Sequence, residues 1–225
     1  SEKFSLCLRD MGFFASLADP CIWMRRVNDH YEYIAVYVDD LAIASKDPAG
    51  IIRALTEGYK FKLKGTGPIE FHLGCDFFRD EEGALCFAPR KYIDKLVASY
   101  ERMFGSKPKT NKITSPLVKG DHPEIDDSPF LEEEGIQQYQ SLIGQLQWAI
   151  SLGRFDIAVA IMTMSAFRSA PRKGHLDQVK RICGYLSKMR HSAIRIRTEE
   201  PDYSDIPRTE YDWEFTVYNG PREEI

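Results

Sequence analysis

Runs of apolar residues separated by polar turns follow a helical start, and they predict strands. The runs occupy residues 21–24, 33–38 and 41–44. Asn28-Asp29 is a turn signal between the first two runs, and Asp39-Asp40 separates the second run from the third. Strands joined by such short connections predict an antiparallel meander, with Asp39-Asp40 at a tight hairpin tip.

Elsewhere, apolar residues recur every three or four positions, which indicates helices with one buried face. These helical segments cover residues 3–14, 47–59, 91–100, 137–146, 156–168 and 175–188. Asp47 and Asp156 are each placed to cap a helix N-terminus, and Pro48 suits the first helical position. Residues 70–79 and 84–88 predict two more strands, joined as a second hairpin.

Residues 105–135 interrupt these patterns. They are rich in Lys, Pro, Asp, Glu and Gly and hold few large apolar residues, which predicts a linker or a long exposed loop. Strands followed by helices indicate an α+β fold. A last short strand is predicted at residues 213–218.

The overall charge hides a segregation along the chain. Thirty basic and 34 acidic residues give a net charge of −4, which does not mark a nucleic-acid-binding protein. Residues 151–198 nevertheless hold ten basic and two acidic residues, whereas residues 199–225 hold two basic and nine acidic ones. Solvated surfaces would explain both blocks, but the basic block also suits a phosphate backbone.

The cysteines and the apolar runs exclude several classes of protein. The five cysteines form no Cys-x-x-Cys pair, which argues against a disulfide framework and a zinc site. We expect reduced thiols in a cytosolic or nuclear protein. No apolar run approaches the 18 residues expected of a transmembrane helix, so no membrane partner is predicted.

The stretch Tyr37-Val38-Asp39-Asp40 carries the strongest chemical signal. A strand on each side would fix the backbone at the tip, and Mg²⁺ commonly binds one or two carboxylates together with substrate phosphates. Two such ions can assist phosphoryl transfer at both the attacking and the leaving oxygen. Asp is also a common turn residue, so an Asp-Asp pair taken alone is more often a simple turn.

Seven segments, in order, resemble one protein family, and this resemblance favours a metal site over a simple turn at Asp39-Asp40. They are GFFASLADPCIW at 12–23, YVDD at 37–40, FKLKGTGPIEFHLG at 61–74, RKYIDKLV at 90–97, YQSLIGQLQWA at 139–149, GRFDIAVAI at 153–161 and SAPRKGHLDQVKRICGYL at 169–186. Together they resemble the reverse transcriptase of copia-type long-terminal-repeat retrotransposons. Each segment is weak alone, whereas YVDD within the ordered series is specific.

The resemblance implies a palm sheet that carries the catalytic site. Asp39 would bind Mg²⁺ directly, and Asp40 would support the same site less directly. Both are therefore the expected catalytic residues, with two Mg²⁺ ions in the complete enzyme. Tyr37 and Val38 would line the primer terminus beside the metal ions.

Other matched positions would hold the substrates. Leu73-Gly74 would lie in a primer-grip hairpin that positions the 3′ end of the primer. Lys64 could neutralise or protonate the departing pyrophosphate, although a solvated surface lysine is the simpler interpretation. His175 is expected to cap or pack at a helix start. Basic residues of the later helices would contact phosphates without reading sequence; these are Arg168, Arg172, Lys173, Lys180, Arg181 and Lys188.

The resemblance also divides the chain. It implies a partial palm at residues 1–90, a thumb helix and acidic linker at 91–135, helical thumb and connection at 136–198, and an acidic tail at 199–225 that leads toward an RNase H domain. The family's other catalytic aspartate and its fingers lie upstream of the matched segments. We therefore expect that this chain alone does not polymerise.

The expected partners are an RNA or DNA template with its primer, deoxynucleoside triphosphates, and the upstream palm and fingers and downstream RNase H of the same polyprotein. The expected location is the cytoplasm, within a virus-like particle, or the nucleus. Two alternatives stay open. The chain could be a non-catalytic, nucleic-acid-binding relic of a decayed retroelement, or an α+β protein in which Asp39-Asp40 is only a turn.

Overall fold

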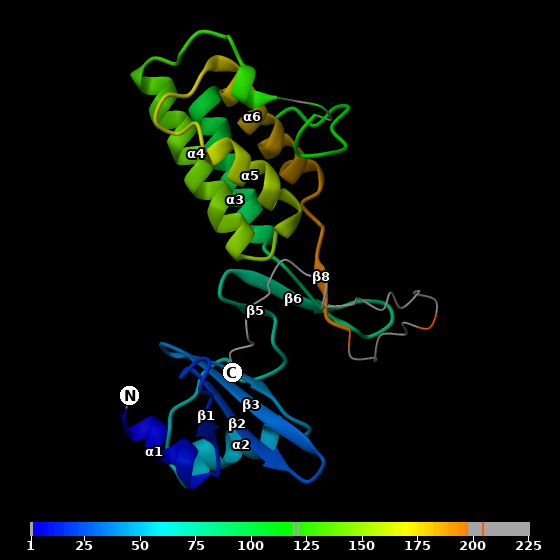
Figure 1. The fold of residues 1–225 in the computed structure, drawn as a ribbon. Helices are drawn as coiled ribbons and strands as arrows, with labels where there is room; N and C mark the ends of the chain where they lie inside the picture. The colour runs from blue at the N-terminus through cyan, green and yellow to red at the C-terminus, as the bar shows by residue number, and fades with distance from the viewer. Residues whose placement is uncertain (1, 119, 121, 198–203, 205–225) are drawn as a thin grey trace, which may run out of the picture.

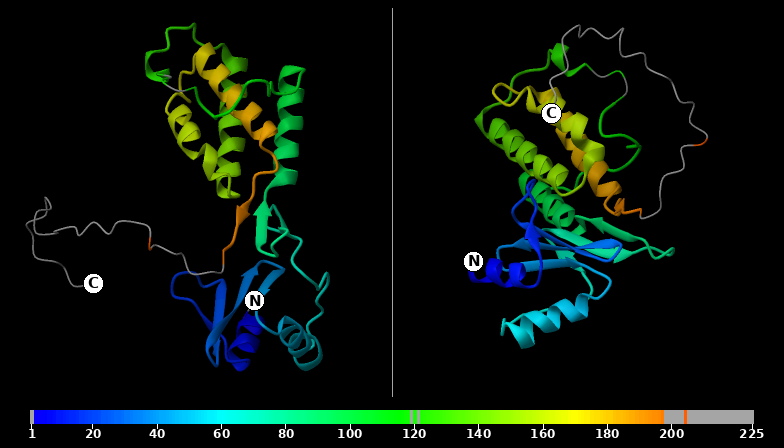
Figure 2. Two further views of the ribbon diagram at one scale, coloured as in Figure 1. Left: turned by 90° about the vertical axis from the view of Figure 1, so that its right-hand side faces the viewer. Right: turned by 60° about the horizontal axis from the view of Figure 1, so that its bottom comes forward.

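Two separate hydrophobic cores organise the fold, which a computed structural model describes for residues 2–118, 120, 122–197 and 204. One core lies under an antiparallel sheet near the N-terminus, and the other lies among four helices (Figure 1). A second antiparallel sheet lies between these two parts in the views of Figures 1 and 2. The architecture is therefore α+β, with four strands in each sheet.

The first sheet is an antiparallel meander in the order β1-β2-β3-β4. Its strands are β1 (Phe14–Ala15), β2 (Ile22–Val27), β3 (His30–Tyr37) and β4 (Asp40–Ala44). Helix α1 (Glu2–Asp10) precedes it, and α2 (Pro48–Arg53) follows and continues into the π-helical turn η1 (Ala54–Gly58). The predicted meander is confirmed. The predicted cap is confirmed as well, because the Asp47 side chain accepts a hydrogen bond of 2.9 Å from the Gly50 backbone N–H.

Alternation along β3 determines which face of this sheet is covered. Glu32 and Ile34 are buried, whereas Tyr31, Tyr33 and Tyr37 between and beyond them are exposed. The buried face packs with α1 and α2 around the N-terminal core. The other face of β3 is open and aromatic, as the two-residue period of a strand with one covered face requires.

The second sheet differs from the prediction in one respect. Its strands, in the order β5-β6-β7-β8, are β5 (Phe71–His72), β6 (Cys75–Arg79), β7 (Leu85–Ala88) and β8 (Ile194–Arg195). The single strand predicted at residues 70–79 is wrong, because Leu73-Gly74 makes a tight turn that divides it.

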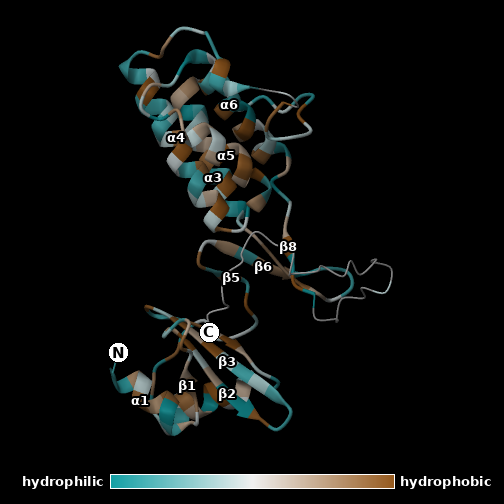
Figure 3. Cartoon of the chain, in the orientation of Figure 1, coloured by the Kyte–Doolittle hydropathy of each residue, from teal (hydrophilic) through white to brown (hydrophobic). Residues whose placement is uncertain are grey.

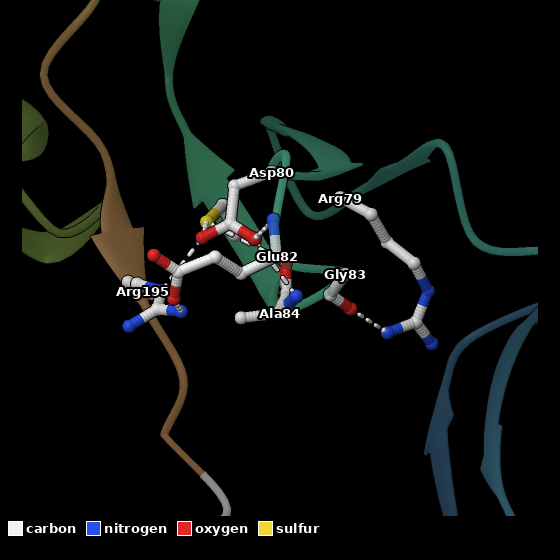
Figure 4. Close-up of polar contacts among 7 residues, drawn as sticks. Arg79, Asp80, Glu82, Gly83, Ala84 and Arg195 are labelled. Atoms are coloured by element: carbon white, nitrogen blue, oxygen red, sulfur yellow. Dashed lines mark hydrogen bonds and ion pairs between the residues drawn. The ribbon is translucent and has the colours of Figure 1, made fainter.

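Strand β8 comes from a distant part of the sequence. It pairs with β7, and its Arg195 guanidinium reaches the turn between β6 and β7 (Figure 4). Arg195 Nε donates to Asp80 Oδ2 at 2.6 Å, and Arg195 Nη2 contacts the Glu82 carboxylate. These contacts attach the chain that leaves the helices to the second sheet.

The helical core is built from α3 (Arg90–Phe104), α4 (Glu133–Ser151), α5 (Ala158–Ser165) and α6 (Lys173–Lys188). Figure 3 shows hydrophobic and hydrophilic residues mixed along these helices, which fits one buried face on each. Among the described residues, no helix is long and apolar enough to span a membrane.

The capping role predicted for Asp156 is wrong. Asp156 lies inside the 3₁₀ turn η3 (Phe155–Ile157), and the following helix has no side-chain cap. Its carboxylate instead accepts two hydrogen bonds from the buried Arg154 guanidinium, at 2.6 and 2.9 Å. Burial raises the pKa of Asp156, but the hydrogen bonds and charge of Arg154 outweigh it and lower the pKa overall.

The segment predicted as a linker at residues 105–135 packs on the helices instead of standing apart. It contains the 3₁₀ turn η2 (Pro123–Ile125), Ile113 is buried, and Phe130 bridges to Arg172 at the start of α6. A few apolar side chains therefore anchor an otherwise polar loop. The strand predicted at residues 213–218 and the acidic tail at 199–225 lie outside the described residues, apart from position 204.

Candidate metal and nucleic-acid site

The hairpin between β3 and β4 closes through a two-residue loop. Tyr37 and Asp40 are the last paired residues, so the loop consists of Val38 and Asp39. The sequence placed Asp39-Asp40 at the tip, and the observed loop begins one residue earlier. Asp40 is therefore fixed as the first residue of β4, and Asp39 stands in the loop beside it.

Both carboxylates are accessible to solvent. Asp40 is paired with Tyr37, which is exposed and belongs to the open face of β3. Asp39 and Asp40 are exposed, and neither has an ion-pair partner among the described residues. A ligand could approach the two carboxylates without displacing other side chains.

Val38 adopts an unfavourable backbone conformation at this tip. Its φ is +52°, in the left-handed region that β-branched residues rarely occupy. A two-residue hairpin loop usually places glycine or asparagine at positive φ. Residues held in such conformations cost on the order of 1–3 kcal/mol and cluster at functional sites.

The chemistry of the tip fits a hard divalent cation in part. Within the described residues, no group of three or more His, Cys, Asp or Glu side chains comes together as a metal site. Two exposed carboxylates agree with Mg²⁺, which often takes only one or two carboxylates and completes its shell with water and substrate phosphates.

The Leu73-Gly74 turn is a second hairpin tip with unusual backbone geometry. Leu73 and Gly74 have φ values of +49° and +88°, the signs of a type I′ turn. Gly74 lies against Leu152 at the end of α4, where a Cβ would be 3.2 Å from Leu152 Cδ2. The Cys75 thiol donates to the Leu152 carbonyl oxygen at 3.4 Å. Helix α4 thus braces this hairpin, and Leu73 is exposed at its tip.

The predicted phosphate contacts do not gather on one exposed patch. Arg168 and Lys173 are exposed. Arg172 donates to the Ser128 carbonyl oxygen at 2.6 Å, and Lys188 donates to the Ile113 carbonyl oxygen at 2.7 Å. Their role toward nucleic acid stays a prediction.

The other two predicted contacts of α6 also lie close to the protein. Lys180 Nζ lies 4.3 Å from the centre of the Phe104 ring, and Arg181 Nε is buried without a hydrogen-bond partner in the part of the chain that the structure describes. Both side chains are half-buried. Only some of the basic side chains predicted to contact phosphates from α6 are therefore free to bind a ligand.

His175 has the packing role expected from sequence. It is buried, its Nδ1 accepts from the Arg172 backbone N–H at 3.1 Å, and its Nε2 lies 2.8 Å from the Pro123 carbonyl oxygen. The ring stacks on Phe167 with centroids 4.1 Å apart. These contacts join η2 to the start of α6.

The sequence did not predict a buried ionic network in the same sheet as the YVDD hairpin, near the start of β3. Glu32 accepts from Arg25 Nε at 2.7 Å and from the Ser45 hydroxyl, across β2, β3 and the end of β4. The Ser45 hydrogen bond, supported by Arg25, lowers the pKa of Glu32. A signal was present, because Glu32 stands two residues before Ile34 on the buried face of β3.

Comparison with known proteins shows that the chain is similar to Pol polyproteins of copia-type retrotransposons. It is 29% identical over 200 residues to a Ty5-1 transposon protein of Saccharomyces cerevisiae, covering 88% of this chain and 62% of that protein. It is 28% identical over 193 residues to the retrovirus-related Pol polyprotein from transposon TNT 1-94 of Nicotiana tabacum, covering 82% of this chain and 14% of the polyprotein.

A third relative is the Pol polyprotein from transposon RE1 of Arabidopsis thaliana, 28% identical over 181 residues, which are 80% of this chain and 12% of the polyprotein. The chain thus spans less than two thirds of each relative. No protein-family model matches the chain. No solved structure matches it either. The relatives support a region of a retroelement Pol polyprotein.

Proposed function

We propose that the chain is the palm and thumb part of a retrotransposon reverse transcriptase, which adds deoxynucleotides to a primer 3′ end on an RNA or DNA template. One observation carries the proposal. A register-fixed hairpin presents Asp39 and Asp40 to solvent, and a valine at its tip adopts a conformation that favours glycine. A turn with only a structural role would be more stable with glycine at this position, whereas strained residues of this kind cluster at functional sites.

In this proposal, residues of the chain position the metal ion and the primer for the reaction. Asp39 and Asp40 would hold Mg²⁺, which supplies electrostatic stabilisation for phosphoryl transfer when bound. Tyr37 lies beside Asp40 on the open face of the sheet and would contact the primer terminus. The Leu73-Gly74 hairpin, braced on α4, would hold the primer strand in place. Positioning of this kind accounts for much of the catalysis of phosphoryl transfer.

Localised cleavage by Fe²⁺ tests the proposal. Fe²⁺ would replace Mg²⁺ on the chain bound to a primer–template duplex, and ascorbate and peroxide would then generate hydroxyl radicals. We expect cleavage of the primer close to its 3′ end and of the protein around residues 38–40. Excess Mg²⁺ should suppress both, and Asp39→Asn and Asp40→Asn should remove both.

Asp29→Asn is the matched control. Asp29 is an exposed carboxylate in the β2–β3 turn, at the opposite end of the same strand β3. Cleavage that survives in Asp39→Asn and Asp40→Asn, or that disappears equally in Asp29→Asn, would contradict the metal site. Duplex binding without localised cleavage would favour the non-catalytic, nucleic-acid-binding alternative.

A further inference from the structure

The chain between η1 and β5 begins with three lysines at alternate positions. Lys60, Lys62 and Lys64 are exposed, and Phe61 and Leu63 between them are half-buried. This segment rises from the first sheet toward the second in Figures 1 and 2. We call the three lysines the lysine row.

The apolar residues between the lysines fix the segment on the N-terminal core. Phe61 and Leu63 both pack against that core. The Phe61 ring meets Phe4 of α1 edge-on, with centroids 5.2 Å apart and planes at 88°. The Phe61 backbone N–H donates to the Leu55 carbonyl oxygen at 2.9 Å. The lysine row therefore belongs to a segment that is anchored on the N-terminal core.

The charge of the lysine row is uncompensated. Residues 58–69 include no acidic residue. Within the described part of the chain, none of the three lysines has an ion-pair partner, whereas Lys46 lies 3.7 Å from Asp29 and Lys91 lies 3.4 Å from Asp76. Three free ammonium groups on one anchored segment form a site for a repeating anion.

The spacing identifies the class of anion. In an extended chain, alternate residues such as Lys62 and Lys64 lie about 6.6 Å apart. Lys60 precedes them at a backbone turn, with a φ of +60°. Phosphates along one strand of a duplex rise about 3.4 Å per nucleotide and also wind around the axis, so successive phosphates lie roughly 7 Å apart. Lysine is a flexible point charge that contacts phosphates without reading bases. The lysine row therefore matches a nucleic-acid backbone.

We propose that Lys60, Lys62 and Lys64 bind successive phosphates of one nucleic-acid strand, independently of sequence. This inference rests on the proposed function and adds a contact surface outside the basic helices. It also gives Lys64 a role in holding the nucleic-acid strand, different from the pyrophosphate contact that the family resemblance implies.

A salt titration of duplex binding tests the lysine row. The full chain, a Lys60→Gln/Lys62→Gln/Lys64→Gln variant and a control would be titrated with a fluorescent primer–template duplex at several NaCl concentrations. The control is Lys95→Gln/Lys107→Gln/Lys109→Gln, which removes the same charge from exposed lysines of α3 and the loop after it. We expect the row variant to lower the slope of log affinity against log salt by about 3, one per lysine. The control should leave it near the wild-type value.

Two outcomes separate failure of this inference from failure of the proposed function. If the wild-type chain binds the duplex and the row and control variants have equal slopes, the lysine row is refuted while the proposed function stands. If the wild-type chain does not bind at low salt, both are refuted. Unchanged thermal unfolding of both variants would show that the substitutions do not act through the fold, and equal weakening on duplexes of unrelated sequence would support phosphate contact.

Discussion

Replacing Arg25 by methionine should destabilise the N-terminal part of the chain. Arg25 Nε lies 2.7 Å from Glu32 Oε2, and Arg25 Nη1 donates to the Met11 carbonyl oxygen at 2.8 Å. The guanidinium also lies 4.5 Å from the centre of the Phe13 ring. Methionine keeps the apolar length of the side chain, but of the partners among the described residues it leaves the Glu32 carboxylate only the Ser45 hydroxyl.

The magnitude follows from the burial of the two side chains. Removing one partner of a fully buried ion pair costs about 3–5 kcal/mol, because the remaining charge is uncompensated. The Glu32 side chain is 5% exposed, but that of Arg25 is 27% exposed, so water screens part of the interaction. We expect a loss of about 2–3 kcal/mol for Arg25→Met. The double variant Arg25→Met/Glu32→Leu should recover part of this loss.

Thiol labelling during urea unfolding measures the loss of stability separately in the N-terminal core and in the helical core. Cys7 is buried in the N-terminal core and Cys183 is buried in the helical core. Arg25→Met should expose Cys7 to labelling at lower urea while leaving the Cys183 midpoint unchanged. An unchanged Cys7 midpoint in Arg25→Met, or a double variant less stable than the single one, would refute the reasoning.

Three further outcomes are expected. The hydrogen bond from Ser45 and the pairing with Arg25 lower the pKa of Glu32, so the stability that ionised Glu32 contributes is fully present above the ordinary value of 4.5 and is lost as the pH falls through the lowered pKa. Glu32→Gln should therefore weaken the loss of Cys7 protection from labelling that the wild-type chain shows at acid pH. An equal loss in both proteins would contradict this. Gly184→Ala places a Cβ 2.1 Å from the Lys109 carbonyl oxygen, so circular dichroism in urea should show a loss of about 1–3 kcal/mol, and an unchanged midpoint would argue against this packing. Val38→Gly should stabilise the N-terminal part of the chain by up to about 1 kcal/mol, because glycine relieves the positive φ, so Cys7 should be labelled only at higher urea. A lower urea midpoint for Cys7 would show that Val38 is not strained.

The elements predictable from sequence were those with a strong local period. The meander around Tyr33 and the capped helix start at Asp47 depend on neighbouring residues, so the pattern alone located them. Strand β8 has two residues and exists because Ile194 packs against Gly153 and Arg195 reaches a distant turn. Asp156 could not be assigned correctly either, because a buried arginine two residues earlier competes for its carboxylate.

The candidate site was predictable in identity but not in geometry. The letters YVDD located the hairpin, whereas the strain at Val38 and the exposure of Asp39 and Asp40 depend on a loop register that the structure alone provides. The lysine row was missed although its alternation is visible in the sequence. The alternation becomes informative only when Phe61 and Leu63 are seen to be anchored.

The strained tip, the buried network and the covered sheet face depend on one another. A valine at positive φ persists only where the flanking register is fixed, because a slip of one residue would move Ile34 out of the core and Tyr37 into it. The Arg25–Glu32 pair resists such a slip, since the slipped register would leave a buried carboxylate unpaired. Burial of that pair and the fixed register therefore hold the backbone at Asp39 and Asp40 in one place, which is the arrangement that the proposed phosphoryl transfer would require.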